Sequence, residues 1–141
     1  MLLADKAIRE EGSRKVYISG IFDQISAREF PTRHDTMSVY LALTDGKPGD
    51  HTGQLNLVYI DSPAEHPGTD PVAETDLVSM SGPLQFPKDK LAVIELIMEL
   101  RGIVFPRPGT LQLRFSVDGS LIVERTFRVT LSKPEDNRDA R

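Results

Sequence analysis

Three histidines, His34, His51 and His66, are the residues of this chain best suited to bind a transition metal. A zinc site built from them would also need carboxylate ligands, and no pair of them shows a spacing with fixed ligand geometry, such as HExxH. We therefore interpret the histidines as solvated loop residues and predict no metal site. The carboxylates that could complete such a site are Asp45, Asp50, Asp61, Glu65 and Asp70.

The turn between Asp45 and Asp50 is the best candidate for a hard cation, because carboxylates on loops are typical calcium ligands. Calcium needs about six or more oxygen ligands. Two carboxylates with Lys47 between them supply too few, so an ordinary turn is the preferred interpretation. Whether this loop binds a cation stays open.

Catalytic motifs lack their partners in this chain. The serines of the segment Ser79-Met80-Ser81-Gly82 lack the glycine two residues earlier that a nucleophile elbow needs. The glycines within residues 46–53 are not followed by the Lys-Ser/Thr ending of a phosphate loop. Glu95 and Glu99 are interpreted as a solvated face or an interface, since an acid/base pair would need a cleft. We predict that the chain is not an enzyme and uses no cofactor.

Arg101, Phe105 and Arg107 form the combination best suited to a contact surface. Exposed arginine beside aromatic and proline residues is typical of protein interfaces. Arg33 could join them. The alternative is that Phe105 closes the end of the domain while the stems of the arginines cover it. A further possibility is contact through an open strand edge, which offers unpaired backbone groups.

The elements that must position these residues are strands. Two runs alternate apolar and polar residues with the period of a half-buried strand. The apolar positions of the first run are Met37, Val39, Leu41 and Leu43, and those of the second are Leu111, Leu113, Phe115 and Val117.

Turns separate these runs from their neighbours. The dense turn chemistry of residues 45–50 predicts a hairpin into a third extended run over residues 55–59. Asp118-Gly119 reverses the chain again. We expect a three-residue loop there with Gly119 at a positive φ, because an odd loop places Phe115 beside Val123.

Other segments are less clearly defined. Residues 4–11 could form a helix capped by Gly12 or a strand. Residues 16–25 alternate apolar side chains on both faces, so we expect both faces to be covered. A long loop is expected over residues 62–71 and a weaker strand over residues 77–80. Periodicity leaves residues 88–101, from Lys88 to Arg101, open between strand and helix.

Composition excludes several classes of function. The chain has 141 residues, which suits a single domain over residues 1–131 followed by a flexible charged tail over residues 132–141. Seventeen basic against 21 acidic side chains give a net charge of −4, which argues against binding nucleic acid. Cysteine is absent, and the apolar start is too short for a signal peptide or membrane span. We expect a cytoplasmic protein without membrane contact.

Three motifs resemble an uncharacterised family of short bacterial proteins, a domain of unknown function expected to be a β-sandwich. They are GIFDQI at residues 20–25, FPTRH at residues 30–34 and GIVFPRPGTLQLRFSVDG at residues 102–119. The resemblance spans roughly residues 2–131 and implies a strand over the ambiguous segment 88–101. It implies no activity and no site residues.

Together these observations predict an all-β, immunoglobulin-like or related sandwich of seven to eight mostly antiparallel strands. The predicted role is a non-catalytic interaction or assembly module that binds another protein or itself. The alternatives are a ligand-binding sandwich, for carbohydrate or a calcium-dependent surface, and a hydrolase with a loop-assembled site. The absence of Trp and the presence of only 3 Tyr argue against a platform that stacks sugars.

Overall fold

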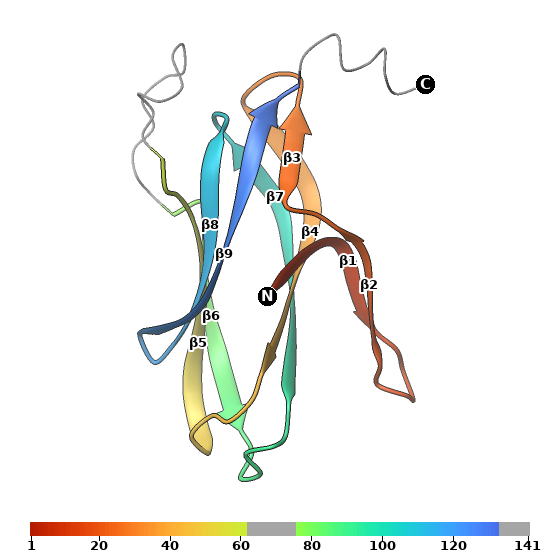
Figure 1. The fold of residues 1–141 in the computed structure, drawn as a ribbon, viewed down its shortest axis with the longest axis vertical. Coiled ribbons are helices and arrows are strands. Elements are labelled where there is room, and N and C mark those ends of the chain that lie inside the picture. The colour runs from red at the N-terminus through yellow and green to blue at the C-terminus, as the bar shows by residue number, and fades with distance from the viewer. Residues whose placement is uncertain (62–75, 133–141) are drawn as a thin grey trace.

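The computed structural model describes residues 1–61 and 76–132, which form two packed β-sheets without any helix (Figure 1). The first sheet has the order β2-β1-β4-β7 and the second the order β3-β9-β8-β5-β6. The predicted all-β sandwich is confirmed, with nine strands in place of seven to eight. Their bounds are β1 (Leu2–Arg9), β2 (Val16–Ile21), β3 (Gln24–Ala27), β4 (Thr32–Leu43), β5 (Gly49–Tyr59), β6 (Val78–Phe86), β7 (Ile94–Phe105), β8 (Gly109–Val117) and β9 (Ser120–Leu131).

The two strands with the clearest alternation lie at the centre of the sandwich. β4 turns its predicted apolar positions into the core from the first sheet, and β8 does so from the second. Their polar positions face outward because successive side chains of a strand point to opposite faces. The alternation therefore predicted both the strands and the faces that they bury. The buried members are Met37, Val39, Leu41, Leu43, Leu111, Leu113 and Phe115.

The alternation of β7 is interrupted at Gly102. Leu100 and Ile103 are both buried although two residues lie between them, whereas a regular strand buries every second residue, so the inward face changes between them. Gly102 has a φ of +63°, a left-handed conformation that glycine adopts without the steric cost of a Cβ. β7 thus keeps one unbroken alternation from Ile94 to Arg101 and changes its inward face at Gly102. We call residues 94–101 the straight part of β7, in the sense of this unbroken alternation.

The turn over residues 45–50 does not close a hairpin, so that prediction is wrong. β4 pairs with β1 and β7, whereas β5 pairs with β6 and β8 in the other sheet. The connection therefore crosses from one sheet to the other, and the two strands contribute side chains to one core from different sheets. Turn residues specify a reversal of the chain, but the burial of two apolar faces decides which sheet the next strand joins.

The turn between β8 and β9 has two residues rather than the predicted three. Val117 pairs with Ser120, which leaves Asp118 at φ +50° and Gly119 at φ +83° in the loop. The positive φ of Gly119 is confirmed. A register shift next to Phe115 then restores the predicted pairing of Phe115 with Val123. The extra residue that the sequence analysis places in the loop lies in a β-bulge of β9 instead.

Neither ambiguous segment is helical. Residues 2–9 form β1, and the segment 88–101 is a strand only from Ile94 onward, because a turn and loop occupy residues 88–93. The expectation that both faces of residues 16–25 are covered is wrong for β2, because Tyr17 and Ile21 are exposed. β2 is an edge strand and belongs to a hairpin that extends from the body of the sandwich (Figure 1).

Two predictions fall on residues that the structure does not describe. They are the loop over residues 62–71 and, apart from Ser132, the tail over residues 132–141. The weaker strand expected over residues 77–80 is the start of β6. Within residues 1–61 and 76–132 the structure contains no helix that could cross a membrane.

Candidate interaction surface

Arg107 is a buried residue and not a surface residue as predicted. Its side chain is 3% exposed, and its guanidinium donates from Nη1 to Asp61 Oδ1 at 3.1 Å and from Nη2 to the Asp61 carbonyl at 2.9 Å. The guanidinium carbon also lies 4.0 Å from the centre of the Tyr59 ring. The partner residues, Tyr59 and Asp61, lie at or just after the end of β5 and are distant from Arg107 in the sequence.

The Arg107 contacts belong to a larger polar cluster. The second carboxylate oxygen of Asp61 accepts the backbone N–H of Thr110 at 2.8 Å, and the Tyr59 hydroxyl donates to the Arg107 carbonyl at 2.7 Å. Burial raises the pKa of Tyr59, which keeps this hydroxyl protonated as a donor. The cluster ties the end of β5 to the start of β8, and its geometry is that of a structural joint.

Phe105 is fully buried as well. Its ring packs edge to face against Phe127, with ring centres 6.3 Å apart. Arg101 alone of the three predicted contact residues is exposed, and it pairs with Glu99 at 3.1 Å. The exposed surface expected from Arg101, Phe105 and Arg107 is therefore not assembled. The alternative interpretation is supported in one part: Phe105 is buried, whereas Arg107 packs on the Tyr59 ring.

The candidate metal ligands do not converge. In the described ranges no group of three or more His, Asp or Glu side chains is placed to hold a metal ion. His34 instead lies beside the Phe22 ring, with centres 6.0 Å apart. His66, Glu65 and Asp70 lie outside the described residues.

His51 connects two turns by hydrogen bonds from both ring nitrogens. Nδ1 lies 2.5 Å from Asp118 Oδ2 and Nε2 lies 2.6 Å from the Lys47 carbonyl. Both partners are acceptors, so the arrangement fits the doubly protonated ring. The Asp118 hydrogen bond is the main cause that raises the pKa of His51, and the same bond lowers the pKa of Asp118. Thr52 N–H also donates to Asp118, at 2.9 Å.

The candidate acid/base pair does not converge either. Glu95 accepts a hydrogen bond from the Tyr40 hydroxyl and pairs with Arg9 at 3.5 Å, whereas Glu99 pairs with Arg101. The Glu95 hydrogen bond raises the pKa of Tyr40. The two carboxylates stand on the outer, solvated face of β7 with Ile97 between them, and their role in an interface stays a prediction.

The open edges of the two sheets differ in how well they are protected. β3 has 4 residues and β2 has 6, and both are short. β6 carries Gly82-Pro83, and proline blunts an edge because it has no N–H to donate. β9 is open along the part that β3 does not cover, where Arg125 reaches the Met1 carbonyl at 3.4 Å. β7 has 12 residues without proline, and its outer side pairs with no described strand.

A groove lies between the edge strands β6 and β7, where the two sheets are not closed against each other. Its volume is about 190 Å³, and its lining is mainly apolar. Leu96 and Met98 of β7 point toward the core, but they are only half-buried because this side of the sandwich is open. The other main contributors are Met80, Pro83, Leu84 and Phe115.

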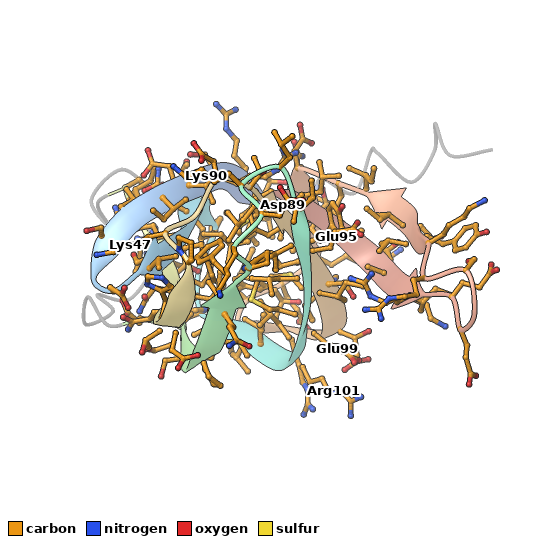
Figure 2. All side chains as sticks on the ribbon, turned by 90° about the horizontal axis from the view of Figure 1, so that it is seen from below. Lys47, Asp89, Lys90, Glu95, Glu99 and Arg101 are labelled. Atoms are coloured by element: carbon orange, nitrogen blue, oxygen red, sulfur yellow. The ribbon has the colours of Figure 1, made fainter. Side chains whose placement is uncertain are left out.

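The outer face of β7 carries three charged side chains, Glu95, Glu99 and Arg101, and the apolar Ile97. Glu99 and Arg101 project from the rim of the sandwich, and Glu95 lies toward the β1–β2 hairpin (Figure 2). Ahead of the strand, the side chains of Leu91 and Val93 are 87% and 61% exposed. We use the name open side for two features together: the straight part of β7, residues 94–101, and the groove beside it. The alternation within residues 88–101 was the only sequence signal for it.

The comparisons with known proteins support a family assignment without an activity. The model of a family of unknown function, DUF6941, matches residues 1–130. None of the curated proteins matches the chain.

Proposed function

This chain belongs to DUF6941, a family of unknown function, and from its structure we propose that it is a non-catalytic protein-interaction module. Its binding site is the open side, and its ligand is an extended segment of a protein. The single observation that carries this proposal is the unpaired outer side of β7 beside an apolar groove.

The strand order supports this assignment. One sheet contains the neighbours β1-β4-β7 and the other β9-β8-β5-β6, which follow the orders A-B-E and G-F-C-C′ of immunoglobulin-like sandwiches. In a constant-type domain, strand D pairs with the outer side of strand E. β7 holds the position of E, and no strand within residues 1–61 and 76–132 holds that of D. A strand from a partner can take this position.

The mode of binding would be β-strand addition. Backbone N–H and C=O groups of β7 supply the affinity, and alternating side chains of the ligand supply the specificity. One face of the added strand would place apolar side chains beside Leu96 and Met98, which are half-buried at present. The other face would meet Glu95, Glu99 and Arg101, so polar or charged side chains fit there.

Photo-crosslinking in the cells that make the protein tests this proposal. A photoreactive amino acid at Ile97 should link to an extended segment of a protein, and the same amino acid at Leu121, an exposed apolar residue of β9, serves as the control. The linked segment, made as a peptide, should slow hydrogen exchange of the β7 amides. No link from position 97, or protection elsewhere than β7, would overturn the proposal.

The same proposal includes the immunoglobulin-like assignment, which rests on the strand order given above. We keep the expectations that the family is bacterial and that the chain works in the cytoplasm, which cell fractionation checks. The ligand-binding and hydrolase alternatives are less well supported, because the candidate carboxylates and histidines among the described residues are dispersed.

A further inference from the structure

We propose that the strand which completes β7 is β7 of a second copy of this chain. The two strands would run antiparallel about a two-fold axis beside Met98, and the two four-stranded sheets would become one continuous sheet. This inference rests on the proposed function, since it names the partner of the same edge. Three properties of β7 carry it: the extent of its unbroken alternation, the face to which each side chain points, and the positions of its charges.

The straight part of β7 restricts the possible registers. It extends from Ile94, where the strand begins, to Arg101, before the change of face at Gly102. Residues opposite each other in an antiparallel pair must point to the same face of the sheet. A symmetric pairing therefore centres on a residue, and only centres at Ile97 or Met98 use nearly all of the straight part.

The charges distinguish these two centres. With Ile97 at the centre, Glu95 would lie opposite Glu99 of the partner subunit, and like charges directly opposite each other destabilise a sheet. With Met98 at the centre, Glu95 lies opposite Arg101 of the partner subunit, and symmetry repeats this pair. Glu95 can keep Tyr40 and Arg9 as partners, because a carboxylate offers about four acceptor sites.

The inward face agrees with the Met98 centre. Met98 would lie opposite Met98 of the partner subunit, and Leu96 opposite the partner's Leu100. Leu96 and Met98 are the half-buried members of the groove, so the pairing covers apolar surface that one copy leaves open. The pairing also removes the longest unprotected edge, which would otherwise favour uncontrolled association.

A disulfide test determines the register directly, because the chain contains no cysteine. In the proposed dimer, a cysteine at position 98 lies opposite its own copy, at a cross-strand separation close to disulfide reach. Under mild oxidation, Met98→Cys should form a linked dimer about tenfold faster than Leu121→Cys, the exposed control. Faster linking by Ile97→Cys than by Met98→Cys would overturn the proposed register.

A charge-exchange test examines the same pairing without cysteine. Arg101→Glu alone and Glu95→Arg alone each place like charges opposite each other, so each should raise the dimer dissociation constant about tenfold or more in sedimentation experiments. A mixture of the two variants should form a heterodimer, because both cross-strand pairs are then attractive. Arg114→Glu, on the exposed outer face of β8, is the control and should leave dimerisation unchanged.

The outcomes separate this inference from the proposed function. Preferential linking at position 98 together with heterodimer formation supports the second copy as the partner. A wild-type chain that stays monomeric up to about 1 mM, the weak end of specific binding, overturns the second copy as partner. The proposed function fails separately, through the absence of any protein segment linked to position 97.

Discussion

The Arg107 end and the open side of this sandwich contain similar residues in opposite environments. Arg107 lies under the end of β5, and each terminal nitrogen of its guanidinium donates at least one hydrogen bond. Arg101, six residues earlier, projects into solvent, and its guanidinium pairs with Glu99 on the same strand. The Arg107 end is a closed joint, whereas the open side has an unpaired strand and half-buried apolar residues.

The difference shows that residue type does not identify a contact surface by itself. Arginine, phenylalanine and proline are enriched at interfaces, but they also close the ends of domains. What separates the two regions is a partner distant in sequence. Asp61 and Tyr59 reach Arg107, while no described strand reaches the outer side of β7. The following predictions test this contrast, from the largest effect to the smallest.

The largest effect should come from Phe105 at the closed end. Phe105→Ala removes a fully buried ring that packs against Phe127, so it should lower the free energy of unfolding by about 3–5 kcal/mol. Phe115→Ala should fall in the same range. Val104→Ala, at the exposed neighbouring position, should change it by less than about 0.5 kcal/mol. Urea unfolding measures all three, and a loss below about 1 kcal/mol for Phe105→Ala would contradict the closed end.

The second effect concerns the buried ion pair. Arg107→Met leaves the Asp61 carboxylate without its main cationic partner and should cost about 3 kcal/mol, the low end for a broken buried pair, since Asp61 is 10% exposed. Arg101→Met on the open side should cost less than about 0.5 kcal/mol. Adding Asp61→Leu to Arg107→Met should recover part of the loss. Equal costs for the two arginine variants would remove the contrast between the regions.

The third effect depends on pH and tests the contact between two turns. The pKa of His51 is raised above its ordinary value of 6.5, so its stabilisation is fully present below pH 6.5 and is lost as the pH rises through the folded-state pKa. Protonation of Asp118 removes the contribution at acidic pH: because the pKa of Asp118 is lowered, the stabilisation is present above its ordinary value of 3.8 and is lost as the pH falls through the folded-state pKa. The contribution should therefore be greatest between these two values.

Melting temperatures of the wild type and of His51→Gln measure this effect. The difference between them should be larger at about pH 5.5 than at about pH 8.5, and Asp118→Asn should show the same trend. A difference that grows as the pH rises would mean that the neutral ring makes the contact.

The fourth effect separates association from stability on the open side. Ile97→Lys places a charge on the edge strand, which is a natural device against edge pairing. Because Ile97 is half-buried and lines the groove, the substitution should lower the free energy of unfolding by about 1 kcal/mol, well below the loss for Phe105→Ala, and abolish binding of the added strand. Urea unfolding and light scattering measure the two quantities. A large loss of stability without loss of association would assign Ile97 to the core instead.

The smallest effect is expected from metals. Added calcium or zinc should leave the melting temperature unchanged, because tight binding to the folded state would raise it. Both ring nitrogens of His51 are engaged in hydrogen bonds, so this side chain has no free lone pair for zinc. A metal-dependent rise that disappears in an Asp45→Asn, Asp50→Asn variant would restore the cation-site interpretation.

Local patterns in the sequence predicted much of the fold. The alternation of residues 37–43 and 111–117 predicted two central strands and their buried faces, because period-two burial depends only on neighbouring residues. The pairing of Phe115 with Val123 was predicted correctly, although the bulge that produces it was not. The hairpin over residues 45–50 was predicted wrongly, since the choice of sheet depends on contacts far along the chain. The predicted exposure of Arg107 was wrong for the same reason, because Tyr59 and Asp61, which bury it, are distant in the sequence.

The sequence by itself determined the class of the protein, the position of its main strands and the lack of familiar catalytic motifs. These properties follow from composition, alternation and short-range spacing, which act through neighbouring residues. Only the tertiary structure decided which arginine is buried, which strand edge is open and which half-buried residues line a groove. Those features depend on which strands become neighbours, and that is a result of burying all apolar faces together.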